Sequence, residues 1–307
     1  MTKDGHDGYI FYTEETSFGV VADDQIWDRM LEVTSVSGRG PSQEVKDMRR
    51  HGKRGRAGHP RGKRDEDPLV FECTMVDDAV ATNQYDVFIQ GIFTEAFDVA
   101  PTSYVFIISD NTNPSASTNL EYYYGCTLDE IEITIEEGEP IGLSMSFIRS
   151  HFLSSASELH VSSSNTYNAY PATIVYLLWS DVTISKVAAT GWTNTGVLPN
   201  VSSMTITVSQ GGEKKFRING SKMPKDVHFG EFMISGSMTI DYDNLDEITE
   251  VESEKEGDLE VVISPTAGLV ATITLTGSVY EGFPFDSEVN SLITADVDYS
   301  SDAVTFA

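Results

Sequence analysis

The sequence predicts a mainly β protein: a β-sandwich or partly closed barrel with one flanking α-helix and one long loop. Short runs rich in Val, Ile, Thr, Tyr and Phe recur along the 307 residues, and several alternate apolar with polar side chains. Long helical periodicity is scarce. Because 40% of the residues are hydrophobic, a sizeable core is expected, and we predict that residues 1–307 form a single domain.

The first third of the chain alternates strands with one helix. Strands are expected at residues 8–13, 25–37, 69–76 and 103–109. A helix is expected at about 81–97, because seven apolar residues follow i, i+3, i+4, i+7 spacing and form one face: Tyr85, Phe88, Ile89, Ile92, Phe93, Ala96 and Phe97.

The middle of the chain predicts a hairpin with one wet face. Ile131, Ile133 and Ile135 alternate with Glu and Thr residues in 127–136, and residues 141–149 return with the same period after a Gly-Glu-Pro turn. A nearly continuous apolar run at 173–179 predicts a buried strand. Further strands are expected at 182–187, 203–208, 231–242, 259–263, 268–280 and 291–299, with loops at 110–119 and 150–170 and an acidic loop at 243–258.

The formal net charge of −28 is distributed unevenly. Residues 39–64 contain 10 of the 20 basic residues and only two acidic ones, so this segment carries +8 and the remainder carries −36. The surrounding stretch 38–67 is too polar to bury itself and predicts a long loop. An acidic chain repels itself at low salt, whereas molar salt shortens the Debye length to about 3 Å and screens that repulsion.

No catalytic or metal-binding pattern rises above background. The six histidines lack metal-ligand spacing, and no nucleophile elbow or phosphate loop is present. Asp241, Asp243 and Asp246 lack the central Gly and the final Glu of a calcium loop. Cys73 and Cys126 are expected to be buried thiols, although one disulfide between them stays open. We therefore predict no enzyme activity, no metal and no cofactor.

Neither a secretion signal nor a membrane-spanning segment is recognisable. The protein is expected to be made and kept as a soluble cytoplasmic product.

Four segments resemble the tail tube (major tail) proteins of long-tailed, siphovirus-like viruses of bacteria and archaea. They are YIFYTEETSFGV near the start; QIWDRMLEVTSVS, which a long loop separates from LVFECTMV; YYYGCTLDEIEITIEEGEPIGLSMSFI in the middle; and SSMTITVSQGGEKKF followed by HFGEFMISGSMTIDY. Their order along the chain carries the resemblance. The length and the acidity of this chain depart from the usual pattern.

The resemblance implies a structural subunit that forms hexameric rings, in which the inner strands join into an inter-subunit β-barrel. Rings would stack into a hollow tube that conducts the genome from the capsid to the host cell. The implied partners are further copies of the chain and the tape measure and tail completion proteins, and the implied location is the virion tail after assembly in the host cytoplasm. The acidity suggests a haloarchaeal virus. DNA would pass an acidic lumen without specific binding, because few cations face its phosphates.

Three interpretations of the basic loop stay open. It docks on the acidic surface of a neighbouring subunit, it touches the genome or another tail component, or it is a flexible solvated loop. Aromatic residues, which commonly accompany basic ones in nucleic-acid sites, are missing from it. The first interpretation makes eight residues inter-subunit contacts: Arg49, Arg50, Lys53, Arg54, Arg56, Arg61, Lys63 and Arg64.

Other functions were weighed against the tail tube. One is a different virion structural protein, such as a distal tail, baseplate or capsid-decoration subunit. Another is a β-rich adhesion or carbohydrate-binding module, in which Trp27, Trp179 and Trp192 stack on sugars; three scattered tryptophans are more typical of a core. A hydrolase on a β scaffold has no candidate active site.

Overall fold

Strands dominate the described part of the chain, which confirms the mainly β class. The computed structural model describes residues 8–21, 25–40, 48–49, 56–58, 66–77, 87–89, 91–92, 102–117, 120–153, 165–171, 173–188, 190–192, 194–198, 200–217, 223–241, 250, 252–265, 271–282, 285–286 and 294–307. Most of its strands belong to one hydrogen-bonded network. No closed barrel is seen among these strands.

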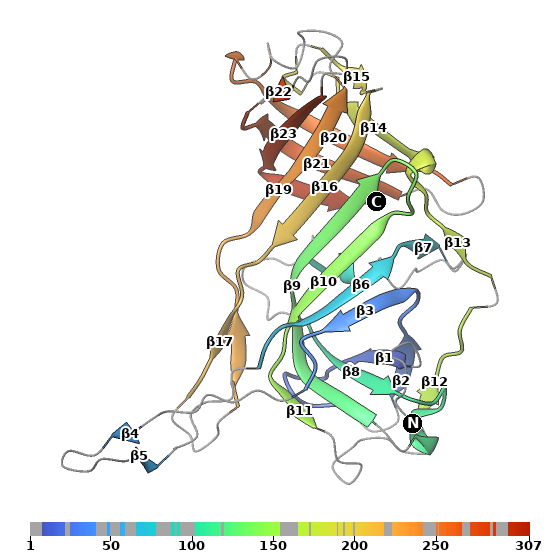
Figure 1. Ribbon diagram of the computed structural model, residues 1–307, viewed down its shortest axis with the longest axis vertical. Coiled ribbons are helices and arrows are strands. Elements are labelled where there is room, and N and C mark those ends of the chain that lie inside the picture. Colours follow the sequence, from blue (N-terminus) through green and yellow to red (C-terminus); the bar gives the residue numbers. More distant parts are fainter. Residues whose placement is uncertain are drawn as a thin grey trace.

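A single long strand, β9 (Leu120–Glu136), connects the two ends of the molecule (Figure 1). Its first half pairs with β8 (Ser103–Ser109) and β11 (His151–Leu153). Its second half pairs with β10 (Gly142–Ile148) and β16 (Val201–Ser209). Because both parts of the sheet pair with β9, this one continuous strand links them.

The part around the first half of β9 contains the N-terminal strands. All the strand pairs here are antiparallel except β12 with β2. The elements are β1 (Tyr9–Glu14), which pairs with β8 and with β2 (Ile26–Arg29); β12 (Thr166–Tyr167), which follows β2; and β6 (Leu69–Thr74), which joins β10 to β3 (Val33–Ser37).

The other part continues from β16 through antiparallel neighbours toward the C-terminus. In spatial order these are β19 (Met233–Asp241), β23 (Thr294–Ser301), β21 (Ala271–Tyr280), β20 (Glu256–Ile263) and β14 (Val182–Lys186), with β24 (Ala303–Phe306) on β21, β22 (Phe285–Asp286) on β23 and β15 (Gly196–Val197) on β14.

Three short pairs lie outside this network. They are β7 (Val76–Asp77) with β13 (Val175–Tyr176), β17 (Glu213–Lys215) with β18 (Asp226–His228), and β4 (Met48–Arg49) with β5 (Arg56–Gly58).

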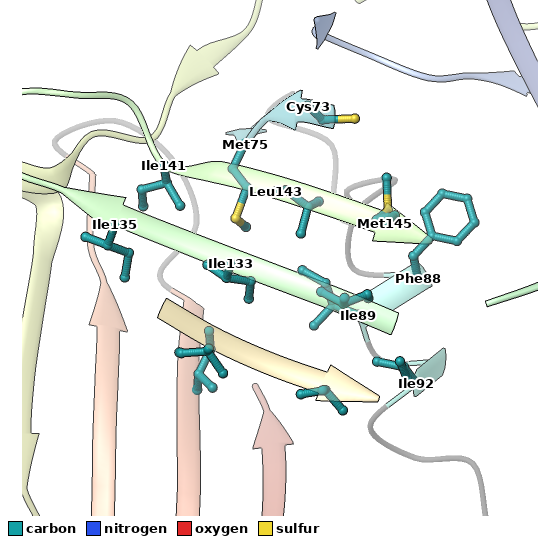
Figure 2. Packing of buried hydrophobic residues seen from close by; sticks show 14 of the residues in the cluster. Cys73, Met75, Phe88, Ile89, Ile92, Ile133, Ile135, Ile141, Leu143 and Met145 are labelled. Atoms are coloured by element: carbon teal, nitrogen blue, oxygen red, sulfur yellow. The ribbon is translucent and has the colours of Figure 1, made fainter. Parts of the chain in front are cut away.

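The main core lies on one face of the central strands. Ile133 and Ile135 of β9 and Leu143 and Met145 of β10 are buried there, and Figure 2 shows them side by side. Their polar neighbours in sequence point to the opposite face, as alternation requires. A smaller core that includes Trp27, Phe11 and Tyr122 covers the other face of β1, β8 and the first half of β9. Strand β8 is consequently buried along its whole length.

The predicted helix is confirmed where it is described, at residues 87–89 and 91–92. Phe88, Ile89 and Ile92 are at most 1% exposed and pack on the apolar face of the central strands (Figure 2). The other residues of the predicted apolar face lie outside the described residues: Tyr85, Phe93, Ala96 and Phe97.

Several predicted boundaries were wrong. The expected strand at 25–37 is two strands, β2 and β3, because Glu32 adopts a positive φ of 46° that no continuous strand accepts. The strand expected from residue 127 starts at Leu120, and the expected loop 150–170 contains β11 and β12.

The apolar run 173–179 is mostly not a strand. Only Val175–Tyr176 forms a strand, which pairs with β7; Leu178 makes an isolated bridge to Pro140, and then a 3-10 helix, η3 (Trp179–Asp181), begins. Leu177 is buried, but Leu178 and Trp179 are 40% and 41% exposed. Apolar composition alone does not distinguish a strand buried on both faces from a segment that crosses a surface. Trp27 and Trp192 are core residues as predicted, and Trp179 is not.

Both cysteines are buried free thiols, as predicted. Cys73 lies on β6 and Cys126 on β9, and no disulfide joins them.

A glycine allows β9 to turn through its middle. Gly125 has a φ of +58° and lies beside the register shift between β8 and β9. Its N–H donates to Glu15 Oε1 at 2.8 Å, and the other carboxylate oxygen of Glu15 accepts from Ser103 Oγ at 2.6 Å. Burial raises the pKa of Glu15, and these donated hydrogen bonds act against that rise. The bulge is therefore held by a half-buried carboxylate.

Gly125→Ala is expected to destabilise the protein by about 2–4 kcal/mol, because an L-residue is strained at this φ and its Cβ would collide. That Cβ would lie 2.6 Å from the Ser150 Cβ and 2.9 Å from the Phe18 ring. Gly142→Ala is the control, since its nearest neighbour would be at 3.6 Å and its φ is not positive. Urea unfolding of both variants measures the difference, and equal losses would contradict the account.

Candidate functional site

A polar face extends across six strands of the central sheet. The pairing registers place one residue from each strand in a row that runs across β6, β10, β9, β16, β19 and β23: Glu72, Ser144, Glu132, Thr207, Ser235 and Ser300. The next row along the strands has the same character: Thr74, Gly142, Thr134, Thr205, Ser237 and Asp298. We call this surface the polar face.

The polar face carries acidic and hydroxyl side chains. Among the described residues of these six strands, no Lys or Arg lies on this face, and Val70, Ile148 and Met233 are apolar residues on it. The carboxylates are Glu72, Glu130, Glu132, Glu136, Asp241, Asp296 and Asp298. The wet face predicted for the central hairpin is therefore confirmed, and it is part of a wider surface.

Hydroxyl groups on the polar face donate to its carboxylates. Ser144 Oγ donates to Glu72 Oε1 at 3.1 Å, and Thr239 Oγ1 donates to Asp296 Oδ1 at 2.8 Å. Burial raises the pKa of Glu130, and the nearby carboxylates of Asp129 and Glu132 raise it further. The surface thus has many hydrogen-bond acceptors and a negative potential.

The two ends of the basic segment are fastened to the body by a buried arginine. The Arg149 side chain is 1% exposed; its Nε donates to the carbonyl of Asp67 at 2.6 Å, and its Nη2 donates to the carbonyl of Gly40 at 2.7 Å. Nη2 also lies 3.7 Å from the buried Glu66 carboxylate, and the guanidinium sits 5.2 Å from the centre of the Tyr123 ring. Gly40 lies at the start of the segment and Glu66–Asp67 follow its end, so one cation sets the separation of the two ends.

A second ion pair holds Arg39, the first residue of the basic segment. Arg39 donates to both carboxylate oxygens of Glu121, at 3.0 and 2.7 Å, and the Tyr123 hydroxyl donates to Glu121 at 2.6 Å. Burial opposes ionisation of Glu121, but the bonds from Arg39 and Tyr123 outweigh it and lower its pKa. Partners 82 residues apart have no signature in the sequence, which explains why the Arg39 and Arg149 contacts were not predicted.

The predicted contact residues lie mostly outside the described residues. Arg49 is on β4 and Arg56 is on β5, which pair as a hairpin and correct the prediction that 38–67 has no strands. In Figure 1 this hairpin lies beyond the lower end of the body. The remaining predicted contacts fall outside the described residues: Arg50, Lys53, Arg54, Arg61, Lys63 and Arg64. Within the predicted acidic loop 243–258, β20 already begins at Glu256.

The described part of the chain contains no candidate metal site. No three His, Cys, Asp or Glu residues there lie close enough together to hold a metal ion. Asp241 lies on β19, whereas Asp243 and Asp246 are outside the described residues. Burial raises the pKa of the Cys126 thiol, which disfavours the reactive thiolate. Within the described helices, none is long and apolar enough to cross a membrane.

Comparison with known families gives one match that covers nearly the whole chain. Residues 5–301 match the model of the family described as "Phage tail tube protein". The chain belongs to the phage tail tube protein family. This family membership makes the protein a structural component of a virion tail and not an enzyme.

Solved structures that are similar to this tail tube family member come from phage-like particles. One is a chain of the virion of the native gene transfer agent particle, with 12% identity and a TM-score of 0.30 over 42% of this chain and 96% of that one. Another is a chain of the six-fold symmetrised baseplate of the anti-feeding prophage, with 12% identity and a TM-score of 0.28 over 41% of this chain and 91% of that one. No curated protein matches the chain in sequence.

The Arg39–Glu121 pair is expected to contribute to stability only above acidic pH. Because the folded pKa of Glu121 is lowered, its contribution is complete above its unfolded pKa of about 4.3 and is lost as pH falls through the folded value. Both side chains are partly exposed, at 44% and 30%, so Glu121→Gln should cost only about 0.5–1 kcal/mol at pH 7. Urea unfolding of both proteins from pH 7 to pH 3 tests this, and a difference that persists at pH 3 would refute it.

Proposed function

We propose that the chain forms hexameric rings that stack into a hollow tail tube, with the polar face lining the lumen that conducts the genome to the host cell. The observation that supports this is the polar face itself, six strands wide, with seven carboxylates and no described Lys or Arg. On this proposal, residues 1–307 act as one domain of the ring.

The chemistry of the polar face suits a surface along which DNA slides. Proteins hold DNA mainly through cations and N–H donors that contact its phosphates. The polar face has described carboxylates instead, and the hydroxyls of Ser144 and Thr239 already donate to Glu72 and Asp296. A phosphate is therefore repelled there and meets no described cation, so passage is not slowed by binding.

An open sheet edge supports joining between copies. Within the described residues, β3 pairs only with β6, so its other edge has no strand beside it. Unpaired edges are usually covered in a native assembly. In the proposed ring this edge joins the sheet of the neighbouring copy, and the inner strands together make the inter-subunit barrel.

Charge supports two further parts of the proposal, the assembly arm and the host. The +8 segment docks on the −36 remainder of a neighbouring copy, so it is an assembly arm and not a DNA contact. By the family resemblance, the further partners at the tube ends are the tape measure and tail completion proteins, and assembly takes place in the host cytoplasm. The net charge of −28 fits the molar salt of a haloarchaeal host.

Negative-stain electron microscopy of the purified protein from 0.1 to 3 M salt tests the assembly. We expect six-fold rings and long hollow tubes, with assembly and thermal stability increasing between 0.1 and 2 M salt as self-repulsion is screened. Monomers at every salt concentration would overturn the tube proposal. Equal stability and equal assembly at 0.1 and 2 M salt would contradict only the proposed halophilic host.

A cation placed on the polar face is expected to retain DNA. Thr207→Lys puts an amine on β16 beside Glu132, in the middle of the face, and a six-fold ring repeats it six times. We expect tubes of normal length that retain short double-stranded DNA at low salt, whereas wild-type tubes do not. Thr207→Ser is the matched control. Equal DNA retention by Thr207→Lys and Thr207→Ser tubes would place the polar face outside the lumen.

A further inference from the structure

An exposed apolar surface surrounds Trp179. Trp179 is 41% exposed and Val197 is 61% exposed, and both line one hollow of about 220 Å³; Leu178, next to Trp179 in sequence, is 40% exposed. Ile135, Leu198 and Glu137 also line this hollow, which we call the Trp179 notch. Exposed apolar side chains gathered in one hollow usually mark an interaction site.

The Trp179 notch has a firmly held frame. The backbone N–H of Trp179 donates to the carbonyl of Glu139 at 3.3 Å, and the Asp181 carboxylate accepts from the backbone N–H of Leu178 at 3.1 Å. Pro140 forms a bridge with Leu178, which fixes η3 to the turn between β9 and β10. The tryptophan is therefore presented by rigid backbone, which reduces the entropy lost on binding.

One side of the notch is an incompletely paired strand edge. Strand β14 pairs with β20 along all five of its residues, but on its other side β15 pairs only with Ser185 and Lys186. Val182, Thr183 and Ile184 line the notch, but two backbone groups on this edge are already used: the Leu198 N–H donates to the carbonyl of Ile184 at 2.8 Å, and the Val182 N–H donates to the carbonyl of Trp179. Side chains, and not an added strand, therefore determine what the notch binds.

The charges around the notch are all negative among the described residues that line it or hold η3. They are Glu137 in the lining, Glu139 in the turn and Asp181 at the end of η3. Neither Lys nor Arg is among the described lining residues. An aromatic face surrounded by carboxylates favours a guanidinium or ammonium group.

We propose that the Trp179 notch receives the basic β4–β5 hairpin of a second copy of this chain. The hairpin brings the opposite charge, because it belongs to the +8 segment. In Figure 1, β4 and β5 lie near the lower end of the molecule, whereas β13 and β14, which flank Trp179 in sequence, lie in its upper half. A hairpin and a receptor toward opposite ends give a head-to-tail contact that continues without closing.

This inference rests on the proposed function and assigns its ring-to-ring contact. Two variants separate the partners: a receptor variant, Trp179→Ala with Glu137→Arg, and a hairpin variant, Arg49→Glu with Arg56→Glu. Each should form single rings but no tubes, with ring pairing at least roughly tenfold weaker, because cation–π and ionic contacts are lost at six positions. Mixed together, they should form paired rings, because the intact hairpin of one meets the intact notch of the other.

Matched controls change similar residues elsewhere. Ile26→Ala removes an apolar side chain that is 60% exposed on β2, and Lys225→Glu reverses an exposed charge beside β18. Both should form tubes of wild-type length. Trp179→Tyr keeps an aromatic face and should retain tube formation, which guards against a loss caused by misfolding; circular dichroism checks the fold of every variant.

The outcomes distinguish the two proposals. If wild-type protein forms neither rings nor tubes, the proposed function is wrong. Normal tubes from the receptor variant leave the proposed function intact and overturn the notch as the receptor. If wild-type protein forms tubes but the mixture of the two variants forms no paired rings, the hairpin docks elsewhere or another partner fills the notch. Either result also overturns this inference.

Discussion

The architecture depends on the continuity of β9. Its 17 residues belong to both parts of the sheet, so each part fixes the orientation of the other through one backbone. The bulge at Gly125 separates the two halves, and the half-buried carboxylate of Glu15 holds that bulge to β1 and β8.

The two halves of β9 meet different environments because their side chains differ. From Tyr122 to Leu128 every residue is buried, between the main core and the smaller core of Phe11 and Trp27. From Asp129 to Glu136 burial mostly alternates, so the isoleucines join the core while the glutamates belong to the polar face. One strand therefore both anchors the subunit and presents its acidic surface.

Charge is divided between the interior and the surface. The polar face keeps like charges in water, where hydroxyl donors and salt moderate their repulsion. The buried Arg149 is instead compensated by Glu66 and by two backbone carbonyls, and it thereby holds the ends of the basic segment together. The proposed notch at Trp179 would give that segment a partner on the next copy.

The sequence by itself determined the class of the fold, the central hairpin with its wet face, the apolar face of the helix, the buried thiols and the tail tube family. These features are local, because alternation and helical spacing follow from side-chain directions within one element. Tertiary structure decided the rest. Glu32 splits one expected strand, β9 extends back to Leu120, and the apolar run ending at Trp179 reaches the surface. Pairing between residues roughly 70 positions apart joins the hairpin to β6 and β16, and the contacts of Arg39 and Arg149 with partners about 80 residues or more away fasten the basic segment. Such contacts depend on how distant strands align, and no pattern within a single segment encodes that.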